Sequence, residues 1–541
     1  MSLQSTPQHS PISLLEIFPV EVLSIIFSKL QTKERIACTD VCPQWRAFLL
    51  NWPDMWRDIS TEGHFNIGLS LLPFRTYIRG ETVRQVHFDC GEISSWYKPG
   101  EPDTTRVIDF LLAQECFHLQ KVFMRAAFES ESTFSKFVFL TGRDTITELE
   151  IDCKDREIAA MRVLDAVLRY YPNLQRCACK THRDWPVDRA GLFENVKPHQ
   201  HLQELVIHLS GYRPLPIDRI VQYMPKLRRI TSTSLICEDV DPILQHIMAS
   251  CPDIEHINLG GTLEQNPSRM IKSSISSQKG LKSLYICHRR RWRGIGLIHV
   301  MDRYHHTLES LSIFGDLGLH PLVMARLATL SFPRLDTLIL AMTDGGSEAV
   351  DYNINMAAFL RQSTRLRHLH LAKSSANNIV FLNGLQQLSS LRQLIIDDCT
   401  FLTDTALMQL LSHQPHLTDL ILKHTGAVTD DVFESIATNC TALRILHVHS
   451  PVSTIHGLKR WMDTRAIGSC KQLESLEVYC SAKDHEEMLE SVLDRMGDYA
   501  KQWQFGTLPQ QDRQCYQIVF THHTWLAKRL QLFQSLYKEV N

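Results

Sequence analysis

Hydrophobic positions recur at a fixed spacing along most of this chain. The repeated unit is Leu-x-x-Leu-x-Leu, often with Ile or Val in place of Leu, and clear copies begin at Ile254, Leu281, Leu308 and Leu335. These copies follow one another about every 27 residues, a period typical of stacked repeats. The unit recurs with starts at Leu366, Leu391, Leu417, Leu443 and Leu473, and earlier, more degenerate copies begin at Val83, Leu119, Ile146, Leu174, Leu202 and Leu227. The pattern therefore predicts roughly fifteen repeats.

Each copy predicts one short strand, because its alternating apolar residues would point to one side of a sheet. The interval between copies predicts a helix, for example at Thr405–Leu411. Neighbouring copies would then stack into a parallel sheet over a continuous core. The expected fold is an α/β solenoid of horseshoe form, with the parallel sheet on the concave side and the helices on the convex side.

A different pattern occupies the N-terminal sixty residues. Val22, Leu23, Ile26, Phe27 and Leu30 lie three or four residues apart and predict one apolar helical face behind Pro19. Further short helical stretches are expected at 33–41 and around 42–49. Three short helices cannot bury so much apolar surface among themselves, which favours a permanent partner.

The order of residues in this segment resembles the F-box. That family has a bulky residue and Pro, an acidic residue, an Ile-Phe-x-x-Leu helix, a Val-Cys-x-x-Trp helix and a late Trp. The resemblance implies a small three-helix F-box that binds a Skp-family adaptor, and through it a cullin-RING ubiquitin ligase. The implied adaptor contacts are Phe18, Pro19, Val22, Leu23, Ile26, Leu30, Val41, Cys42, Trp45 and Trp56. The alternative is a small helical cap packed on the rest of the chain.

The repeats are similar to leucine-rich repeats of the cysteine-containing subtype. Cys251, Cys399 and Cys440 stand at positions that fit this subtype, so we expect buried packing groups there. An F-box followed by such repeats is a known family arrangement. The expected organisation is a polar tail at 1–11, the F-box at 12–60, and a linker or first solenoid cap at 61–80. The leucine-rich-repeat solenoid would span 81–482, and a C-terminal cap or tail 483–541.

Composition narrows the classes of partner. The chain has 541 residues, a net charge of −2 and a pI near 7.0, so it has no global attraction to nucleic acid or to an anionic membrane. The 15 cysteines are scattered singly. Since we find neither a secretory signal pattern nor an apolar run of about 20 residues, we expect a soluble protein of the cytoplasm, the nucleus or both.

Motifs for catalysis are missing from the sequence. We find no phosphate-binding loop, no His-Glu-x-x-His and no Gly-x-Ser-x-Gly. Cys177, Cys179 and His182 could suggest a metal, but both cysteines fall at inward positions of a repeat, which favours the core. We therefore predict no catalytic residue, no metal and no cofactor.

Two features could contact a protein substrate. Arg289, Arg290, Arg291 and Arg293 surround Trp292 and could grip a phosphorylated or acidic partner, although a solvated loop is the alternative.

The second feature is a row of outward strand positions. The row comprises Ile339, His370, Ile395, Ile421 and His447, with Asp397 and Lys423 as a polar rim. We expect His368, His370, His447 and His449 to face solvent. The isoleucines need cover, from a substrate or from the tail after Val478, which carries Trp503, Phe520, Trp525 and Leu530.

Taken together, the resemblance implies a non-catalytic substrate receptor, with an unknown protein substrate on the solenoid. A leucine-rich-repeat scaffold tethered to the adaptor for purposes other than degradation is the first alternative. An enzyme with an unrecognised site is the second.

Overall fold

The computed structural model describes most of the chain, in two compact units. The described residues are 14–60, 71–89, 104–126, 128, 131–153, 160–181, 193–209, 217–233, 240–260, 279–288, 294–315, 320–342, 349–373, 376–399, 401–425, 428–449, 457, 461, 474–481 and 515–521. The first unit is Met1–Gly211 with Tyr223–Leu227, and the second is Tyr212–Gln222 with Arg228–Asn541.

The first unit opens with a helical module. Its helices are α1 (Leu14–Ile17), α2 (Val20–Ser28), α3 (Thr32–Cys38) and α4 (Pro43–Asn51). The predicted helices correspond to α2, α3 and α4, and α1 is an additional single turn. Pro43 stands in the first turn of α4, where no backbone N–H is needed, and the Cys42 sulfur accepts a hydrogen bond from the Trp45 N–H at 3.4 Å.

Aromatic packing holds the helical module together. The Phe27 ring is 2% exposed and meets Trp45 edge-on, with ring centroids 5.3 Å apart. Phe48 and Trp52 pack against the same ring at 5.9 and 6.2 Å. Trp52 and Trp56, which follow α4, are also buried, so the segment that connects the module to the first strand contributes to the core.

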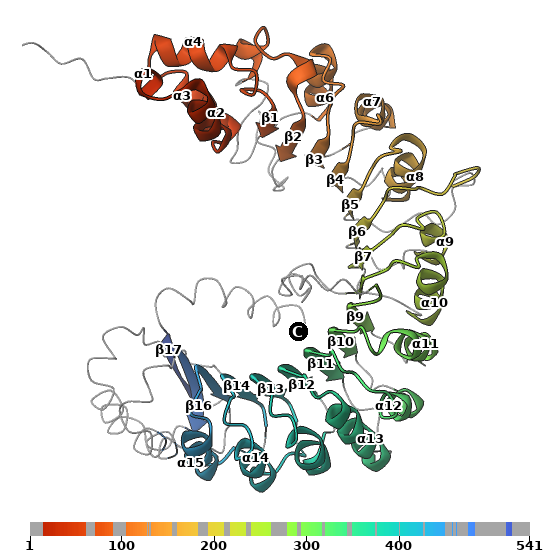
Figure 1. The fold of residues 1–541 in the computed structure, drawn as a ribbon, viewed down its shortest axis with the longest axis vertical. Helices are drawn as coiled ribbons and strands as arrows, with labels where there is room; N and C mark the ends of the chain where they lie inside the picture. The colour runs from red at the N-terminus through yellow and green to blue at the C-terminus, as the bar shows by residue number, and fades with distance from the viewer. Residues whose placement is uncertain are drawn as a thin grey trace, which may run out of the picture. The chain divides into compact units, whose positions relative to one another are not determined.

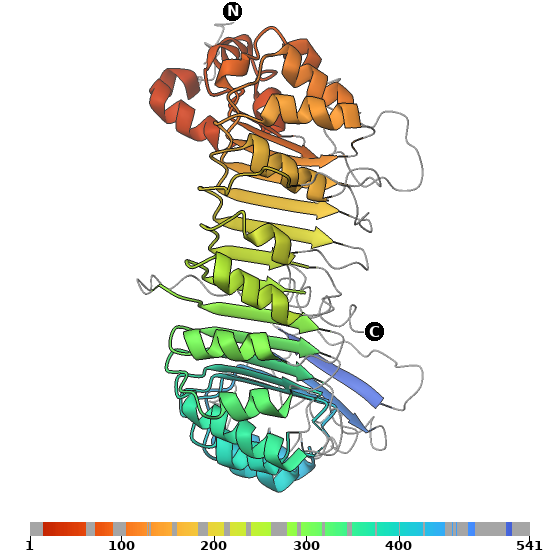
Figure 2. The same ribbon diagram turned by 90° about the vertical axis from the view of Figure 1, so that its right-hand side faces the viewer.

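Behind the module, the first unit is a parallel sheet covered by helices on one side (Figures 1 and 2). Its strands are β1 (Asp58–Ser60), β2 (Gln85–Asp89), β3 (Lys121–Ala126), β4 (Glu148–Cys153), β5 (Arg176–Thr181) and β6 (Glu204–Leu209). The connecting helices are α6 (Thr104–Ala113), α7 (Glu131–Thr141) and α8 (Ala160–Tyr170), with the 3-10 turns η1 (Leu72–Phe74) and η2 (Gly80–Thr82). The side of the sheet away from the helices is called the open face below.

The second unit repeats the same arrangement. Its strands are β7 (Arg229–Ser232), β8 (His256–Leu259), β9 (Ser283–His288), β10 (Ser310–Gly315), β11 (Thr337–Met342), β12 (His368–Ala372), β13 (Gln393–Asp397), β14 (Asp419–Lys423), β15 (Ile445–His449), β16 (Ser475–Ser481) and β17 (Cys515–Thr521). The helical segments are α9 (Ile217–Val221), α10 (Val240–Ser250), α11 (Ile295–Tyr304), α12 (Pro321–Leu327), α13 (Ala349–Gln362), the π-helical η4 (Val380–Leu385), α14 (Asp404–Leu411) and α15 (Asp430–Asn439). The predicted α/β class with a parallel sheet and covering helices is confirmed.

The hydrophobic repeat sets the register of this sheet. In the second unit, for example, Leu284, Leu311, Leu338 and Leu369 are register partners on consecutive strands. The first apolar residue of each described motif copy, such as Leu281 or Leu308, precedes its strand and is buried. At junctions within each unit one carbonyl accepts two bonds from the next repeat. The Lys282 carbonyl accepts from the N–H groups of Glu309 and Ser310 at 2.8 and 3.0 Å.

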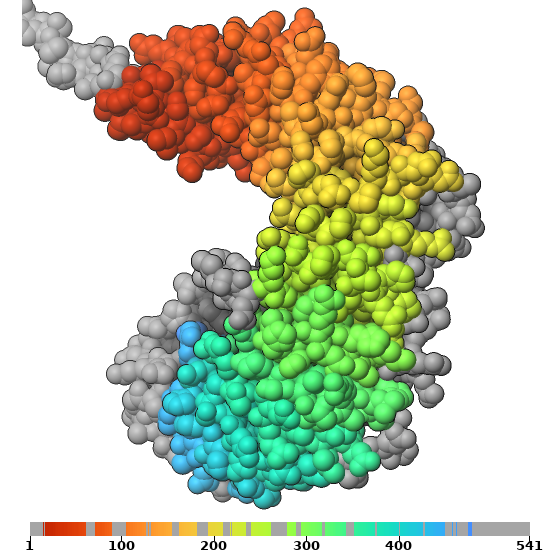
Figure 3. All heavy atoms as spheres, turned by 45° about the vertical axis from the view of Figure 1, so that its right-hand side comes forward, coloured from red at the N-terminus to blue at the C-terminus, as the bar shows by residue number. Residues whose placement is uncertain are grey.

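One edge of the sheet is closed by the helical module. The Thr32 hydroxyl on α3 donates to the Asp58 carbonyl at 2.8 Å and accepts from the Ser60 N–H at 2.9 Å. The buried Arg35 guanidinium donates to the carbonyls of Asp58 and Asp54 at 2.6 and 3.0 Å. The sheet therefore begins at Asp58, inside the segment predicted as F-box. Figure 3 shows the atoms of the module running without a gap into those of the first repeats.

Towards the C-terminus, β17 closes the described sheet. It pairs antiparallel with β16, with Glu477 opposite Val519 and Val478 opposite Ile518. Part of the expected C-terminal tail thus adds a strand to the sheet. Of the apolar tail residues, Phe520 lies on β17 opposite Leu476, while Trp503, Trp525 and Leu530 lie outside the described residues.

We expect Arg35→Met to destabilise the first unit. The substitution removes one donor each from the carbonyls of Asp58 and Asp54, and a lost hydrogen bond from a charged group costs about 1.5–3 kcal/mol. Thermal unfolding should show a melting temperature lower by several degrees. Arg46→Met is the matched control, because Arg46 forms an exposed pair with Asp40 at 2.9 Å. Equal melting of the two variants would contradict a structural role for Arg35 at this edge.

Candidate protein-binding surfaces

The helical module exposes an apolar surface. On α1 and α2, Ile17, Val20 and Ile25 are 55%, 59% and 63% exposed, and Val41 before α4 is 63% exposed. Leu23 and Phe27 on the same helix α2 are buried. The apolar residues of α2 cover most of its circumference, with Glu21, Ser24 and Ser28 on one side, so part of the apolar surface packs inward and part is left without cover.

The residues predicted as adaptor contacts fall into three groups. Phe18, Pro19, Val22 and Ile26 are exposed together with Val41, as the sequence predicts. Leu30, Cys42 and Trp45 are half-buried. Leu23 and Trp56 are 3% and 2% exposed, so the structure corrects them from surface contacts to core residues.

Three exposed residues of this surface were not among the predicted contacts. Ile17, Val20 and Ile25 lie on the outer sides of α1 and α2. The sequence could have indicated their exposure, because they are apolar residues that lie outside the predicted helical face. An apolar arc wider than one core-facing stripe indicates that part of the outer side is covered as well.

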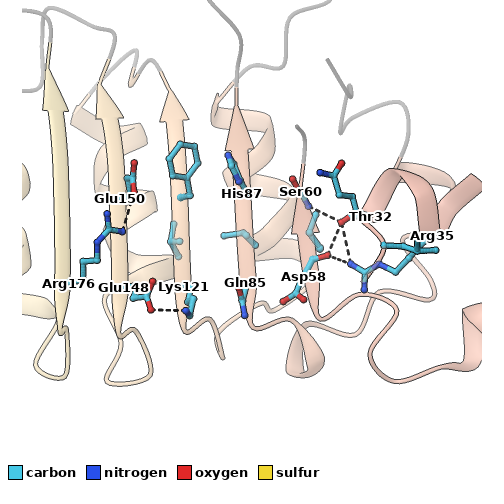
Figure 4. A pocket seen from close by; sticks show the side chains of 16 residues that line it. Thr32, Arg35, Asp58, Ser60, Gln85, His87, Lys121, Glu148, Glu150 and Arg176 are labelled. Atoms are coloured by element: carbon cyan, nitrogen blue, oxygen red, sulfur yellow. Dashed lines mark hydrogen bonds and ion pairs between the residues drawn. The ribbon is translucent and has the colours of Figure 1, made fainter. Parts of the chain in front are cut away.

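Beside this module, a pocket of about 400 Å³ opens on the open face of the first unit (Figure 4). One wall comes from the module, through Leu30, Gln31 and Thr32, and the floor comes from β1 to β5. At its centre the rings of His87 and Phe123 lie 3.9 Å apart. The sequence pattern did not indicate these residues. Each occupies an outward position on its own strand, and only the pairing of β2 with β3 brings the two rings together.

Ion pairs surround the two rings. Lys121 lies 2.6 Å from Glu148, and Arg176 lies 3.3 Å from Glu150. Arg176 also lies 3.5 Å from Glu204 on β6. Burial by itself would lower the pKa of Arg176, but the charges of Glu204 and Glu150 raise it by more, so the pKa lies above its ordinary value. Further along the strands, Asp152 lies between Arg125 at 3.4 Å and Lys180 at 3.5 Å. Basic and acidic strands thus alternate from β3 to β6.

A family model described as F-box-like matches residues 15–62. This match covers α1 to α4 and β1, the elements that form the apolar surface and the first sheet edge. Residues 15–62 are an F-box-like domain. The comparison with curated proteins finds no match.

Among solved structures, the chain is similar to a leucine-rich-repeat protein of Leptospira interrogans. The sequence identity is 12% and the TM-score 0.29, over 68% of this chain and 96% of that chain. A likeness of this size carries no argument, so the assignment of leucine-rich repeats rests on the repeat period and the strand register described above. The chain combines an F-box-like domain with leucine-rich repeats.

The predicted substrate row exists as a continuous row of register partners in the second unit. Ile339, His370, Ile395, Ile421 and His447 lie side by side on β11 to β15, and Asp397 pairs with Lys423. Their role in substrate binding stays a prediction. Arg289, Arg290, Arg291 and Arg293 lie outside the described residues.

The histidines of this row are less solvated than the sequence suggests. The His370 Nε2 atom is buried without a hydrogen bond, and burial, helped by the charge of Lys423, lowers the pKa of His370 to about 4. The side chains of His447 and His449 are 16% and 15% exposed and lie 3.3 and 3.5 Å from Glu477. Ile421 is 2% exposed. The expectation of solvent-facing positions is therefore wrong for Ile421 and for the His370 Nε2 atom.

Glu477 is the charged centre of this cluster. Burial would raise the pKa of its carboxyl group, but the hydrogen bond from His449, with the charges of His447, His449 and Lys423, lowers that pKa to about 2. Burial lowers the pKa of His449. The imidazole of His449 therefore faces a carboxyl group whose pKa lies well below its usual range.

The cysteines behave as packing groups. Cys177, Cys179, Cys251, Cys399 and Cys440 are all buried, as predicted. Burial raises the pKa of the Cys177 and Cys251 thiols to about 12, which leaves almost no thiolate for chemistry. Within the described ranges, no group of His, Cys, Asp and Glu side chains is arranged to hold a metal ion. Among the same residues, no helix combines the length and apolar character that a membrane crossing needs.

We expect the second unit to lose stability as pH falls from about 6.5 to 4. The pKa of His370 is about 4 in the folded chain and that of a free histidine about 6.5, so the unfolded chain binds the proton first. The loss should be on the order of 1 kcal/mol per pH unit within this window. His370→Leu should flatten the dependence in urea unfolding measured at several pH values. His413→Leu changes an exposed histidine and should leave the slope as it is. An unchanged slope in His370→Leu would contradict this assignment.

Proposed function

We propose that this chain is the substrate-recognition subunit of a cullin-RING ubiquitin ligase, and that its F-box-like domain binds a Skp-family adaptor. The observation that carries the proposal is the apolar surface of that domain. Ile17, Val20, Ile25 and Val41 are each more than half exposed. Apolar side chains gathered in this way mark a protein interface.

The energetic argument is the transfer of this surface out of water. Each fully covered Val or Ile side chain contributes roughly 1.5–3 kcal/mol to association, before the costs of binding are subtracted. Several such side chains together are sufficient for a stable complex. The structure of α2 supports the same view, since a lone surface helix would carry polar residues on its outer side.

In this proposal the leucine-rich repeats hold a protein substrate. The Arg35 and Thr32 bonds fix the F-box-like domain to the first strand, so an adaptor bound there keeps a defined position relative to the first repeats. Ubiquitin transfer would be carried out by other subunits, and this chain would supply no catalytic group. A ligase subunit of this kind would act in the cytoplasm, the nucleus or both.

The test of adaptor binding uses two exposed positions. Ile25→Asp and Val41→Asp each place a charge where the adaptor would remove water, so the double variant should lose co-purification of a Skp-family adaptor by roughly 100-fold or more. Both side chains are 63% exposed, so the melting temperature should stay unchanged. Leu322→Asp on α12, at a residue that is 66% exposed, is the matched control.

Undiminished adaptor capture by the double variant would overturn the proposed interface.

A second measurement separates a ligase subunit from a tethered scaffold. Proteins that contact the repeats should accumulate in cells carrying the double variant if they are substrates for degradation. If their turnover stays unchanged while adaptor capture is lost, the scaffold alternative holds.

A further inference from the structure

We propose that a second protein-binding surface lies near the C-terminal ends of α6, α7 and α8, and that it takes an acidic side chain beside an apolar residue of a partner protein. These helices cover the side of the first unit's sheet opposite the open face (Figure 1). The inference goes beyond the proposed function, because the surface shares no residue with the apolar surface of the F-box-like domain. It follows from a guanidinium group that packs on two aromatic rings and bonds to no acceptor.

The guanidinium belongs to Arg143, which follows α7. Its central carbon lies 5.0 Å from the ring centroid of Phe117 and 5.3 Å from that of Phe139. These two rings meet edge-on, with centroids 6.4 Å apart. A cation is attracted to the faces of aromatic rings, so the two phenylalanines hold the charge of Arg143 in a fixed position.

The donors of Arg143 lack acceptors. Its Nε atom is buried without a hydrogen bond, and its two terminal nitrogens reach the surface without one. Asp144 is the next residue and is exposed, yet among the described residues no ion pair joins a carboxylate to Arg143. The terminal nitrogens are therefore available to a carboxylate from another protein, which a planar guanidinium binds through two parallel hydrogen bonds.

Exposed aromatic residues surround this cation. Phe139 on α7 is 62% exposed, and Tyr170, the last residue of α8, is 51% exposed. A Cβ atom added to Gly142 would lie only 3.2 Å from the Tyr170 Cβ, so Tyr170 starts directly beside the turn that carries Arg143. Large exposed apolar groups from successive helices indicate a protein interface. With a cation among them, they complement a segment in which an apolar residue adjoins an acidic one.

The charges near Arg143 favour a carboxylate over a phosphate. Phosphate recognition by proteins uses clusters of arginines, whereas the neighbours of Arg143 in the chain are Gly142 and Asp144. The exposed carboxylate of Asp144 opposes an incoming anion, and it opposes a dianion more than a monoanion. We therefore assign the surface to an Asp or Glu side chain.

The test uses the full chain and short synthetic peptides with acetylated and amidated ends, so that the side chains carry all of the charge. The central pair of each peptide is Leu-Glu, Leu-Gln, Leu-Lys, Leu-phosphoserine or Ser-Glu, and binding is measured by fluorescence anisotropy. The Leu-Glu peptide should bind roughly tenfold tighter than the Leu-Gln and Ser-Glu peptides, with an affinity that falls as salt rises. Arg143→Met should remove the preference for Glu over Gln, and Phe139→Ala the preference for Leu over Ser.

Arg162→Met and Phe401→Ala are the matched controls. The charge of Arg162 is already paired with Glu131 at 2.8 Å, and Phe401 is a 61% exposed aromatic residue of the second unit. Equal binding of the Leu-Glu and Leu-Gln peptides, or tighter binding of the phosphoserine peptide, would overturn the inference. So would control variants that change binding as much as their counterparts do. Adaptor co-purification should be the same in all four variants, which separates this surface from the proposed adaptor interface.

A further substitution changes the affinity in the opposite direction. Asp144→Asn removes an exposed carboxylate beside Arg143 and leaves the guanidinium and both rings in place. The Leu-Glu peptide should then bind roughly two- to threefold tighter at low salt, and the gain should disappear at high salt. A loss of stability cannot produce such a gain, so this result does not depend on how well Arg143→Met folds. An unchanged or weaker affinity at low salt would show that the carboxylate does not bind beside Arg143.

Discussion

A parallel sheet leaves the backbone groups of its outermost strands without partners, and the rest of this structure depends on how its edges are closed. Within the sheet, each repeat supplies the donors that the preceding repeat needs, as the Lys282 carbonyl shows with Glu309 and Ser310. No repeat precedes β1, and α3 takes that place, where Thr32 and Arg35 bond to the backbone of Asp58. At β16 the antiparallel strand β17 adds the partner.

This edge closure joins structure to the proposed function. The F-box-like domain uses one side of α3 to complete the sheet and leaves the outer sides of α2 exposed. The same elements therefore end the solenoid and present an apolar surface to a partner. The pocket at the junction has walls from both parts, since Leu30 and Gln31 line it together with residues of β1 to β5.

The open faces of the two units differ in character. In the first unit, basic and acidic strands alternate, with the ion pairs of Lys121 and Arg176 beside the paired rings of His87 and Phe123. In the second unit, the corresponding row is apolar or contains histidine, and Ile421 and the His370 Nε2 atom are buried. Ion pairs thus characterise the open face of the first unit, while desolvation governs the titration of His370 in the second.

The sequence by itself determined the repeat, its period and the inward residues of each strand, because these follow from local hydrophobic order. The strands begin where the motif places them, and Cys177 and Cys399 are buried as the pattern predicts. It also indicated most of the apolar surface around Val22 and Ile26. Only the tertiary structure decided that β1 starts inside the F-box-like domain, that Leu23 and Trp56 belong to its core, and that His87 meets Phe123. Each of these three features depends on which distant segments of the chain pack together. The spacing of apolar residues along a chain does not indicate which side of a helix or strand another segment will cover.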